Sequence, residues 1–258
     1  MNPKMKITDI EKLPRKKNKI FIDGEYAFML YDKDLALYHI DADSEGGDGT
    51  EREISEQLYD RIMKETVLRR AHQKMLAMLE RMDRTESEIR RKMKLDMYPD
   101  MAADETVEWL KQLHYLDDDR YARNYIRGHL GSASRRELSS KLFAKGISKD
   151  IFDEAYSECC DEVNFKPVRS DRMHRGITGY GATERPGVSE GSGEDHDVEL
   201  DAAVRTLNKK LGTRRNLTPK ERMSVIGYMM RKGFRRNEIM AAFEALDVSI
   251  GHDEVPYE

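Results

Sequence analysis

The strongest constraint in the sequence is a helix-start signal that occurs three times. Thr85–Glu88, Ser134–Glu137 and Thr218–Glu221 each place a hydroxyl side chain three residues before a glutamate. This is the capping box, in which the hydroxyl and the carboxylate each accept a hydrogen bond from the other residue's backbone N–H. Three helices are therefore predicted to begin in the same way, which is typical of an internal repeat.

Two of these helices also share a stop signal. Lys145-Gly146-Ile147 and Lys232-Gly233-Phe234 put a glycine where a helix commonly ends in the left-handed conformation. The glycines are 87 residues apart (233 − 146), whereas the caps are 84 apart (218 − 134). The middle helix of the last unit should therefore be longer by about three residues, roughly one turn.

The most informative segment is Leu116–Ile147, which predicts a helix from near Asp118 and a second from Ser134. The first helix has an apolar face, and Arg120, Arg123 and Arg127 line another face that we expect to be free to bind. The run Asp117–Asp119 resembles a nuclease carboxylate cluster, but consecutive helix positions point in different directions. We therefore interpret it as capping and predict no catalytic role.

The segment Leu116–Arg123, Leu-Asp-Asp-Asp-Arg-Tyr-Ala-Arg, followed by an Arg-rich capping box and a Lys-Gly-Ile stop, resembles the RecX family of bacterial recombinase regulators. The stretch Ile20–Phe28 is similar to the β-rich extension of Gram-positive members. Met97 and His114 stand where the family pattern has glycine. We therefore expect an irregular turn in the first repeat.

The expected fold is mainly α, a tandem repeat of three-helix units in an elongated, curved array with a small N-terminal β-hairpin or sheet. The expected divisions are a β-rich extension (1–60), three repeats (61–115, 116–164 and 199–248), a disordered insertion (165–198) and a frayed tail (249–258). The insertion, rich in glycine and polar residues, would leave the third repeat tethered to the second unless an apolar surface docks the two.

In the extension, short β-branched and aromatic segments flank Asp23-Gly24, a hairpin-turn signal, and predict antiparallel strands over Met5–Ile10, Lys19–Asp23 and Tyr26–Leu30. The basic run Arg15–Lys19 would either contact phosphate or form a solvated loop between strands, and we favour the loop.

Composition excludes several functional classes. Charged residues make up 36% of the 258 and hydrophobic ones 38%, so cores should be thin. No phosphate-binding glycine loop ending in Lys-Ser or Lys-Thr appears, and the histidines and cysteines lack metal-ligand spacing. We therefore expect no enzyme activity, cofactor or metal. With no signal peptide or membrane-length apolar run and with Cys159 adjacent to Cys160, we expect a reduced, cytoplasmic protein without a membrane partner.

The candidate binding residues are basic. Residues 205–236 hold 11 basic residues against one acidic residue, Glu221. Each side chain alone suits a solvated surface, but together they would match phosphates or an acidic groove in a protein filament. The candidates are Arg120, Arg123, Arg127, Arg135, Arg136, Lys141, Lys145, Arg205, Lys209, Lys210, Arg214, Arg215, Lys220, Arg222, Arg231, Lys232, Arg235 and Arg236.

The resemblance to RecX implies a non-enzymatic, monomeric regulator in DNA repair, recombination and the SOS response. It would bind the RecA-type recombinase filament on single-stranded DNA and modulate, above all inhibit, its ATPase and strand exchange. The third repeat would contact DNA or the filament groove and the second the recombinase, but the sequence does not separate these assignments. The alternative is a stand-alone DNA-binding helical repeat protein, architectural or transcriptional.

Overall fold

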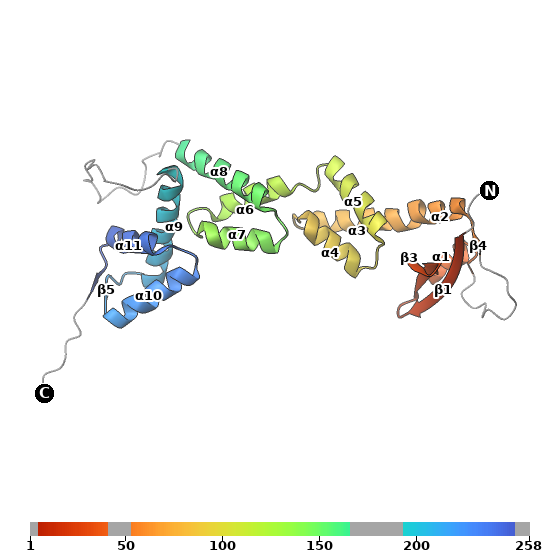
Figure 1. The fold of residues 1–258 in the computed structure, drawn as a ribbon, viewed down its shortest axis with the longest axis horizontal. Coiled ribbons are helices and arrows are strands. Elements are labelled where there is room, and N and C mark those ends of the chain that lie inside the picture. The colour runs from red at the N-terminus through yellow and green to blue at the C-terminus, as the bar shows by residue number, and fades with distance from the viewer. Residues whose placement is uncertain (1–4, 41–52, 166–192, 251–258) are drawn as a thin grey trace, which may run out of the picture. The chain divides into compact units, whose positions relative to one another are not determined.

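The computed structural model describes residues 5–40, 53–165 and 193–250, which are mostly helical with a small N-terminal sheet (Figure 1). The chain divides into two compact units, which we call the N-terminal unit (to Asp118) and the C-terminal unit (from Asp119). The expected elongated, curved arrangement of the whole chain stays a prediction.

The N-terminal sheet has four strands in the order β3-β2-β1-β4, all antiparallel. They are β1 (Met5–Leu13), β2 (Lys17–Ile22), β3 (Glu25–Tyr31) and β4 (Glu53–Ile54). Asp23 and Gly24 have φ values of 52° and 87°, as a tight hairpin turn requires. The hairpin prediction is confirmed, whereas β4 was not predicted because two residues are too short for a detectable pattern.

The basic run Arg15–Lys19 is not a single loop. Arg15 and Lys16 form an exposed turn at positive φ, but the last three residues of the run belong to β2. Asn18 is 1% exposed, and its amide donates to the Asp32 carboxylate at 2.8 Å. The loop interpretation therefore holds only for the first two residues, since β2 continues the ladder to Lys17.

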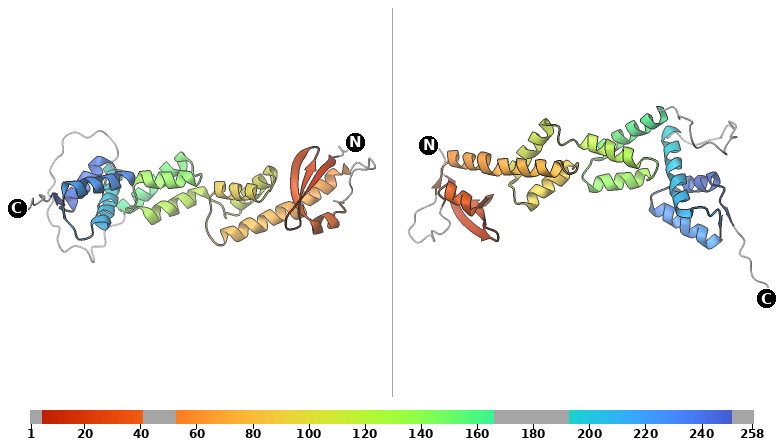
Figure 2. Two further views of the ribbon diagram at one scale, coloured as in Figure 1. Left: turned by 90° about the horizontal axis from the view of Figure 1, so that it is seen from below. Right: turned by 180° about the vertical axis from the view of Figure 1, so that it is seen from behind.

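A continuous helix lies against this sheet (Figure 2). It comprises α2 (Glu56–Ile62), a π-helical segment η1 (Met63–Leu68) and α3 (Arg69–Leu79). Ile62 and Val67 pack with Ile20 and Phe28 of the sheet in one core. A short helix, α1 (Asp32–Leu37), follows β3 and was missed in the sequence because it spans only six residues.

Each of the three repeats contains three helices, as predicted. The first has α3, α4 (Glu86–Leu95) and α5 (Asp100–Gln112); the second has α6 (Asp118–His129), α7 (Arg135–Ala144) and α8 (Lys149–Phe165); the third has α9 (Gly193–Leu211), α10 (Pro219–Arg231) and α11 (Arg236–Ala245). Helix α7 has 10 residues and α10 has 13. The predicted difference of three residues is confirmed.

Two of the three capping boxes form completely. Thr85 with Glu88, and Thr218 with Glu221, exchange both hydrogen bonds. At α7 only half of the box is present: Ser134 accepts from the backbone N–H of Glu137, whose carboxylate instead contacts Lys141 at 2.9 Å and Lys232 at 3.2 Å. The middle box was thus predicted wrongly in part, because its glutamate is engaged by two lysines.

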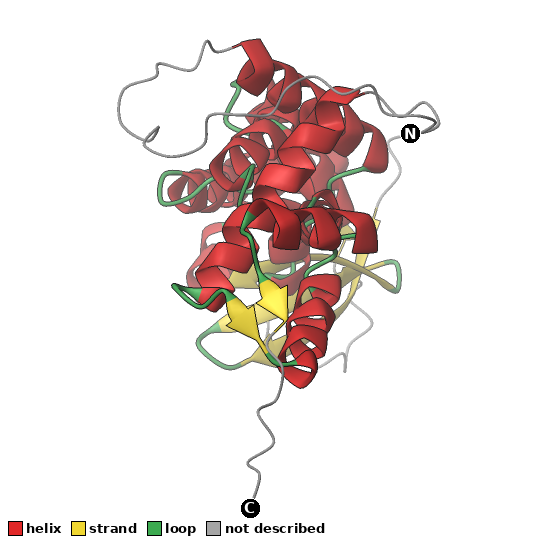
Figure 3. Cartoon of the chain, turned by 90° about the vertical axis from the view of Figure 1, so that its left-hand side faces the viewer, coloured by secondary structure: helices red, strands yellow, loops and turns green. Residues whose placement is uncertain are grey.

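Two boundaries also need correction. Residues 193–198, placed in the disordered insertion because their sequence has no apolar pattern, belong to α9. Ser249–Ile250, placed in the frayed tail, form β6, which pairs in parallel with β5 (Asn216–Leu217) (Figure 3). The remaining parts of both segments, 166–192 and 251–258, lie outside the described residues.

The turn expected to be irregular keeps the regular hydrogen bonds of its counterparts. The Tyr98 N–H bonds to the Met93 carbonyl at 3.0 Å, as the Ile147 N–H bonds to the Leu142 carbonyl at 3.1 Å. Met97 and His114 adopt φ values of 60° and 58°, the conformation that glycine would take. The expectation of an irregular turn was therefore wrong, because the repeat tolerates a strained non-glycine residue instead.

Replacing an exposed strained residue by glycine should stabilise the N-terminal unit. His114→Gly is expected to raise the free energy of unfolding by about 0.5–1 kcal/mol, since the left-handed conformation costs glycine nothing. Urea unfolding of the full chain measures this. Gly146→Ala, at φ +88°, should act in the opposite direction. A lower stability of His114→Gly would contradict the strain argument.

Candidate interaction surface of the C-terminal unit

One hydroxyl group joins the second and third repeats. Ser134 is fully buried, and its Oγ accepts from the Glu137 N–H at 3.1 Å and donates to the Lys232 carbonyl at 2.7 Å. The first bond caps the N-terminus of α7, and the second satisfies a carbonyl at the C-terminus of α10. Helix ends carry backbone groups without intrahelical partners, so the same atom stabilises a helix in each repeat.

A carboxylate of the third repeat completes the cap. Glu199 of α9 accepts from the Arg135 backbone N–H at 2.5 Å and from the Tyr156 hydroxyl at 3.0 Å. Burial raises the pKa of Glu199 above its ordinary value, and the two hydrogen bonds only partly offset this effect. The neighbouring Val198 is buried in the core of the second repeat. An α9 residue therefore belongs to the second repeat's core.

A glycine permits this close approach. Gly233 has φ +93°, and a Cβ at this position would lie 2.6 Å from the Ser134 Oγ and 3.0 Å from the Arg136 Cβ. The third repeat is therefore docked on the second. Of the two arrangements that the sequence left open, tethered or docked through an apolar surface, the structure has the docked one, because Val198 and partly buried hydrogen bonds join the two repeats.

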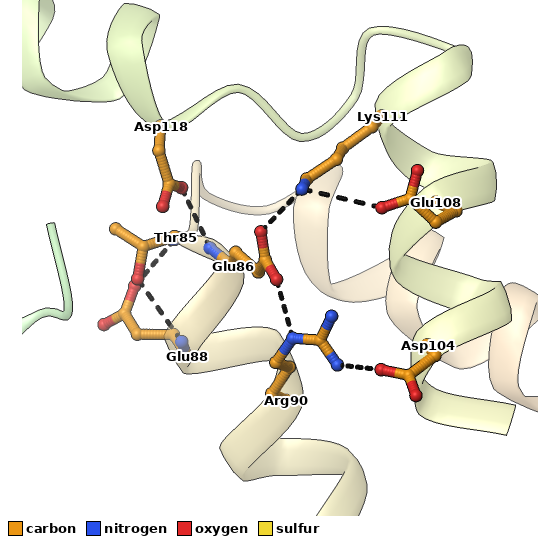
Figure 4. A network of polar contacts seen from close by, with 8 residues as sticks. All are labelled: Thr85, Glu86, Glu88, Arg90, Asp104, Glu108, Lys111 and Asp118. Carbon is orange, nitrogen blue, oxygen red and sulfur yellow. Dashed lines mark hydrogen bonds and ion pairs between the residues drawn. The ribbon is translucent and has the colours of Figure 1, made fainter. Parts of the chain in front are cut away.

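A similar carboxylate cap occurs in the N-terminal unit (Figure 4). The Asp118 carboxylate accepts from the Glu86 backbone N–H at 2.9 Å, at the start of α4. Glu86 itself contacts Arg90 at 2.6 Å and Lys111 at 2.7 Å. Burial opposes ionisation of Glu86, but these cations prevail and lower its pKa. Asp118 thus caps a helix, as predicted for the Asp117–Asp119 run, although the helix is α4 and not its own.

The arginine face of α6 is not free. Two glutamates of α8 pair with it. The guanidinium of Arg123 lies 3.4 Å from the Glu158 carboxylate, and that of Arg127 lies 2.6 Å from the Glu162 carboxylate. The prediction of a free binding face was wrong for these two residues, because α8 supplies carboxylates at the same four-residue spacing. That matched spacing is visible in the sequence and could have revealed the pairing.

Other second-repeat candidates are also engaged. Arg135 lies 2.9 Å from Asp153, with its guanidinium 4.8 Å from the Tyr156 ring. Lys145 lies 5.4 Å from the Tyr121 ring. Arg120 is half-buried in the first turn of α6, whereas Arg136 is exposed on α7.

The third repeat retains more uncompensated positive charge. Arg214 pairs with Glu221 at 2.5 Å, and Arg235, with 83% of its side chain exposed, lies 4.0 Å from Glu238. Arg215 binds the Gly212 carbonyl and the Asn208 side chain, Lys210 lies over the Tyr228 ring and Arg222 over the Phe243 ring. No carboxylate of the described residues is within ion-pair distance of Arg205, Lys209, Lys220, Arg231 or Arg236, which are all exposed.

Two of these exposed cations share a face of α10. Lys220 and Arg231 are eleven residues apart, which is about three helical turns, so both side chains project from the same side of the helix. Met223, 67% exposed, lies on this side as well.

Sequence reasoning found the cations but missed Glu199 and Ser134 as the residues that join the repeats, because that contact is made across more than sixty residues of sequence.

Among the described residues, no three His, Cys, Asp or Glu side chains are grouped as a metal site would need. In the same part of the chain, none of the helices combines the length and apolar character that crossing a membrane requires. Cys159 and Cys160 are buried and not bridged.

Comparison with protein families finds three matches in tandem. The model described as RecX, first three-helix domain, matches residues 71–110; the second three-helix domain matches 117–155; and the third matches 197–243. The matches fall on the three repeats.

Individual proteins agree with this result. Regulatory protein RecX of Clostridium beijerinckii is 30% identical over 168 residues, 65% of this chain and 75% of that protein. Regulatory protein RecX of Listeria monocytogenes serotype 4a is 24% identical over 97% of this chain and 100% of its own. A crystal structure of regulatory protein RecX aligns with a TM-score of 0.51 at 20% identity, covering 93% of this chain and 99% of that one, which supports the fold.

Filling the space at Gly233 should weaken the contact between repeats. Gly233→Ala is expected to lower the free energy of unfolding by about 2–4 kcal/mol, since backbone strain and overpacking against Ser134 add. Gly212→Ala is the matched control, with φ +60° and nothing within 4 Å of its Cβ, and should cost only about 1–2 kcal/mol. Equal losses in urea unfolding would show that the close packing contributes nothing.

Burial of Glu199 predicts a pH dependence with a definite sign. Because its folded pKa lies above the ordinary 4.5, the unfolded chain loses this proton first, and stability falls as pH rises from 4.5 through the folded pKa. Glu199→Gln keeps an acceptor but cannot ionise. The stability of the natural chain relative to this variant should therefore decline between pH 4.5 and 7 in urea unfolding. A difference independent of pH would refute the assignment.

Proposed function

The chain belongs to the RecX family of regulatory proteins, and on that premise we propose that it binds a RecA-type recombinase filament on single-stranded DNA and restrains the filament's ATPase and strand exchange. Contact would be made chiefly by the third repeat. The protein would act by binding alone, without chemistry of its own.

The observation that carries this proposal is the unequal neutralisation of charge in the C-terminal unit. In the second repeat, Arg123, Arg127 and Lys141 are paired with carboxylates. In the third, Lys209, Lys220 and Arg231 are exposed and lack such a partner among the described residues. Unpaired surface cations attract phosphates or an acidic protein surface far more strongly than paired ones do.

Docking of the two repeats supports the same proposal. Because Ser134 and Glu199 join the second repeat to the third, the cations of both are held at defined spacings. A polymeric partner presents its own charges at regular intervals. Each contact then raises the effective concentration for the next, so weak contacts combine into stable binding.

Charge reversal in the third repeat should weaken regulation. We predict that the combined variant Lys209→Glu, Lys220→Glu and Arg231→Glu needs at least about tenfold more protein to inhibit recombinase ATPase on single-stranded DNA. The introduced carboxylates would repel the negatively charged partner. Lys232 is left unchanged because it contacts Glu137 across the repeat boundary. The control, Arg91→Glu with Lys94→Glu, changes two exposed cations of α4 and should inhibit normally.

Two results would argue against the proposal. If the natural chain at stoichiometric concentration leaves the ATPase unchanged, regulation of this recombinase is wrong. If it binds DNA tightly without recombinase, with an affinity that falls steeply with salt, the alternative of a stand-alone DNA-binding protein is favoured. Intact inhibition by the triple variant would contradict the placement of the contact.

A further inference from the structure

A cleft of about 860 Å³ lies at the junction of the second and third repeats. Its walls come from α7, α8, α9, α10 and α11. Its volume falls within the range of sites that bind a small molecule or a few side chains of a peptide. None of the cations tested above for recombinase regulation, Lys209, Lys220 and Arg231, lines it.

The cleft has an excess of positive charge. Five cations line it, Arg135, Arg136, Lys149, Arg235 and Arg236, against the three carboxylates of Asp153, Glu199 and Glu238, an excess of two (5 − 3). Arg136, Lys149 and Arg236 have no ion pair within the described part of the chain. These unpaired cations therefore favour the binding of an anionic ligand.

The same cleft exposes apolar surface. Phe143 of α7 is 44% exposed and Met230 of α10 is 54% exposed, and both are lining residues. Exposed large apolar side chains beside cations are typical of peptide-binding surfaces, where methionine adapts to different partners. A purely ionic site would have no use for them.

The chain's own Glu199 shows how a carboxylate is held here. It accepts a backbone N–H at the start of α7 and the Tyr156 hydroxyl. Side-chain carboxylates of a ligand could instead pair with the guanidinium groups of Arg136 and Arg236, since both residues line the cleft and are exposed.

We propose that this cleft binds an acidic peptide segment of a protein partner, with an aromatic or aliphatic side chain against Phe143 and Met230 and flanking carboxylates on Arg136, Lys149 and Arg236. A nucleic acid strand fits less well. It carries a phosphate at every nucleotide and would bring some of them against Asp153 and Glu238, whereas a peptide can place its charges singly. This inference deepens the proposed function. It rests on that function because the proposed function supplies the premise that the partner is a protein.

Fluorescence anisotropy with the full chain tests this without recombinase or DNA. The probe is a fluorescein-labelled peptide carrying Asp and Glu residues around a Leu-Phe pair. One matched peptide replaces Leu-Phe by Ser-Ser, and another replaces the acidic residues by Lys. We expect saturable binding of the first peptide and at least about tenfold weaker binding of the other two, since both charge and apolar contact are required.

Variants locate the site. Phe143→Ser and Lys149→Glu change exposed side chains and should each weaken binding of the acidic Leu-Phe peptide severalfold, with circular dichroism verifying the fold. Met230→Ser provides an independent apolar change. Arg91→Glu, on α4 outside the cleft, should bind as the natural chain does.

Three outcomes would overturn the inference: no saturable binding of the acidic Leu-Phe peptide, equal binding by all cleft variants, or a labelled oligothymidylate that binds in the cleft more tightly than the peptide does. None of these depends on recombinase. An ATPase unaffected by the natural chain would in turn reject the proposed function and leave the peptide result standing.

Discussion

The structure of the C-terminal unit depends on how the N-terminus of α7 is satisfied. The first backbone N–H groups of any helix lack intrahelical partners, and leaving one buried without an acceptor costs about 1–3 kcal/mol. At α7 the acceptors are Ser134 itself and Glu199 from the following repeat. Separating the repeats would therefore remove the carboxylate acceptor of the Arg135 N–H, which couples the fold of the second repeat to the third.

Joining the two repeats through Glu199 costs free energy, because the carboxylate is partly removed from water. Glu199 is partly buried, and its pKa is raised because removal from water outweighs the two hydrogen bonds that it accepts. The carboxylate accepts hydrogen bonds from two donors at the junction, the Arg135 backbone N–H and the Tyr156 hydroxyl. Asp118 has the same role towards Glu86 in the N-terminal unit. A carboxylate near the start of one repeat's first helix, capping the middle helix of the preceding repeat, is thus a recurring device of this chain.

The sequence predicted what depends on neighbouring residues. The Thr85 and Thr218 boxes, the glycine stop at Gly233 and the extra turn of α10 follow from side chains within a few positions of each other. Family resemblance then gave the order of the repeats, which the family matches confirm. Periodicity also predicted an apolar face on α6, and Ala122 and Ile126 of that helix are buried in the core of the second repeat.

Long-range pairing could not be predicted in the same way. Arg127 meets Glu162 across 35 residues, and Ser134 meets Lys232 across 98. A count of basic residues cannot distinguish a neutralised arginine from a free one, which is why the α6 stripe was overvalued as a binding surface. The cleft at the repeat junction was missed for the same reason: Lys149 and Met230 come from different repeats and line one cleft only once the repeats dock.

The central claim, that the second and third repeats form one cooperative body, is tested most directly by native-state hydrogen exchange on the full chain. The account predicts that the slowest amides of α6–α8 and α9–α11 exchange with one common opening free energy, and that Ser134→Ala lowers it in both repeats by about 1 kcal/mol. Two distinct opening free energies, with only the second repeat responding to the substitution, would contradict it.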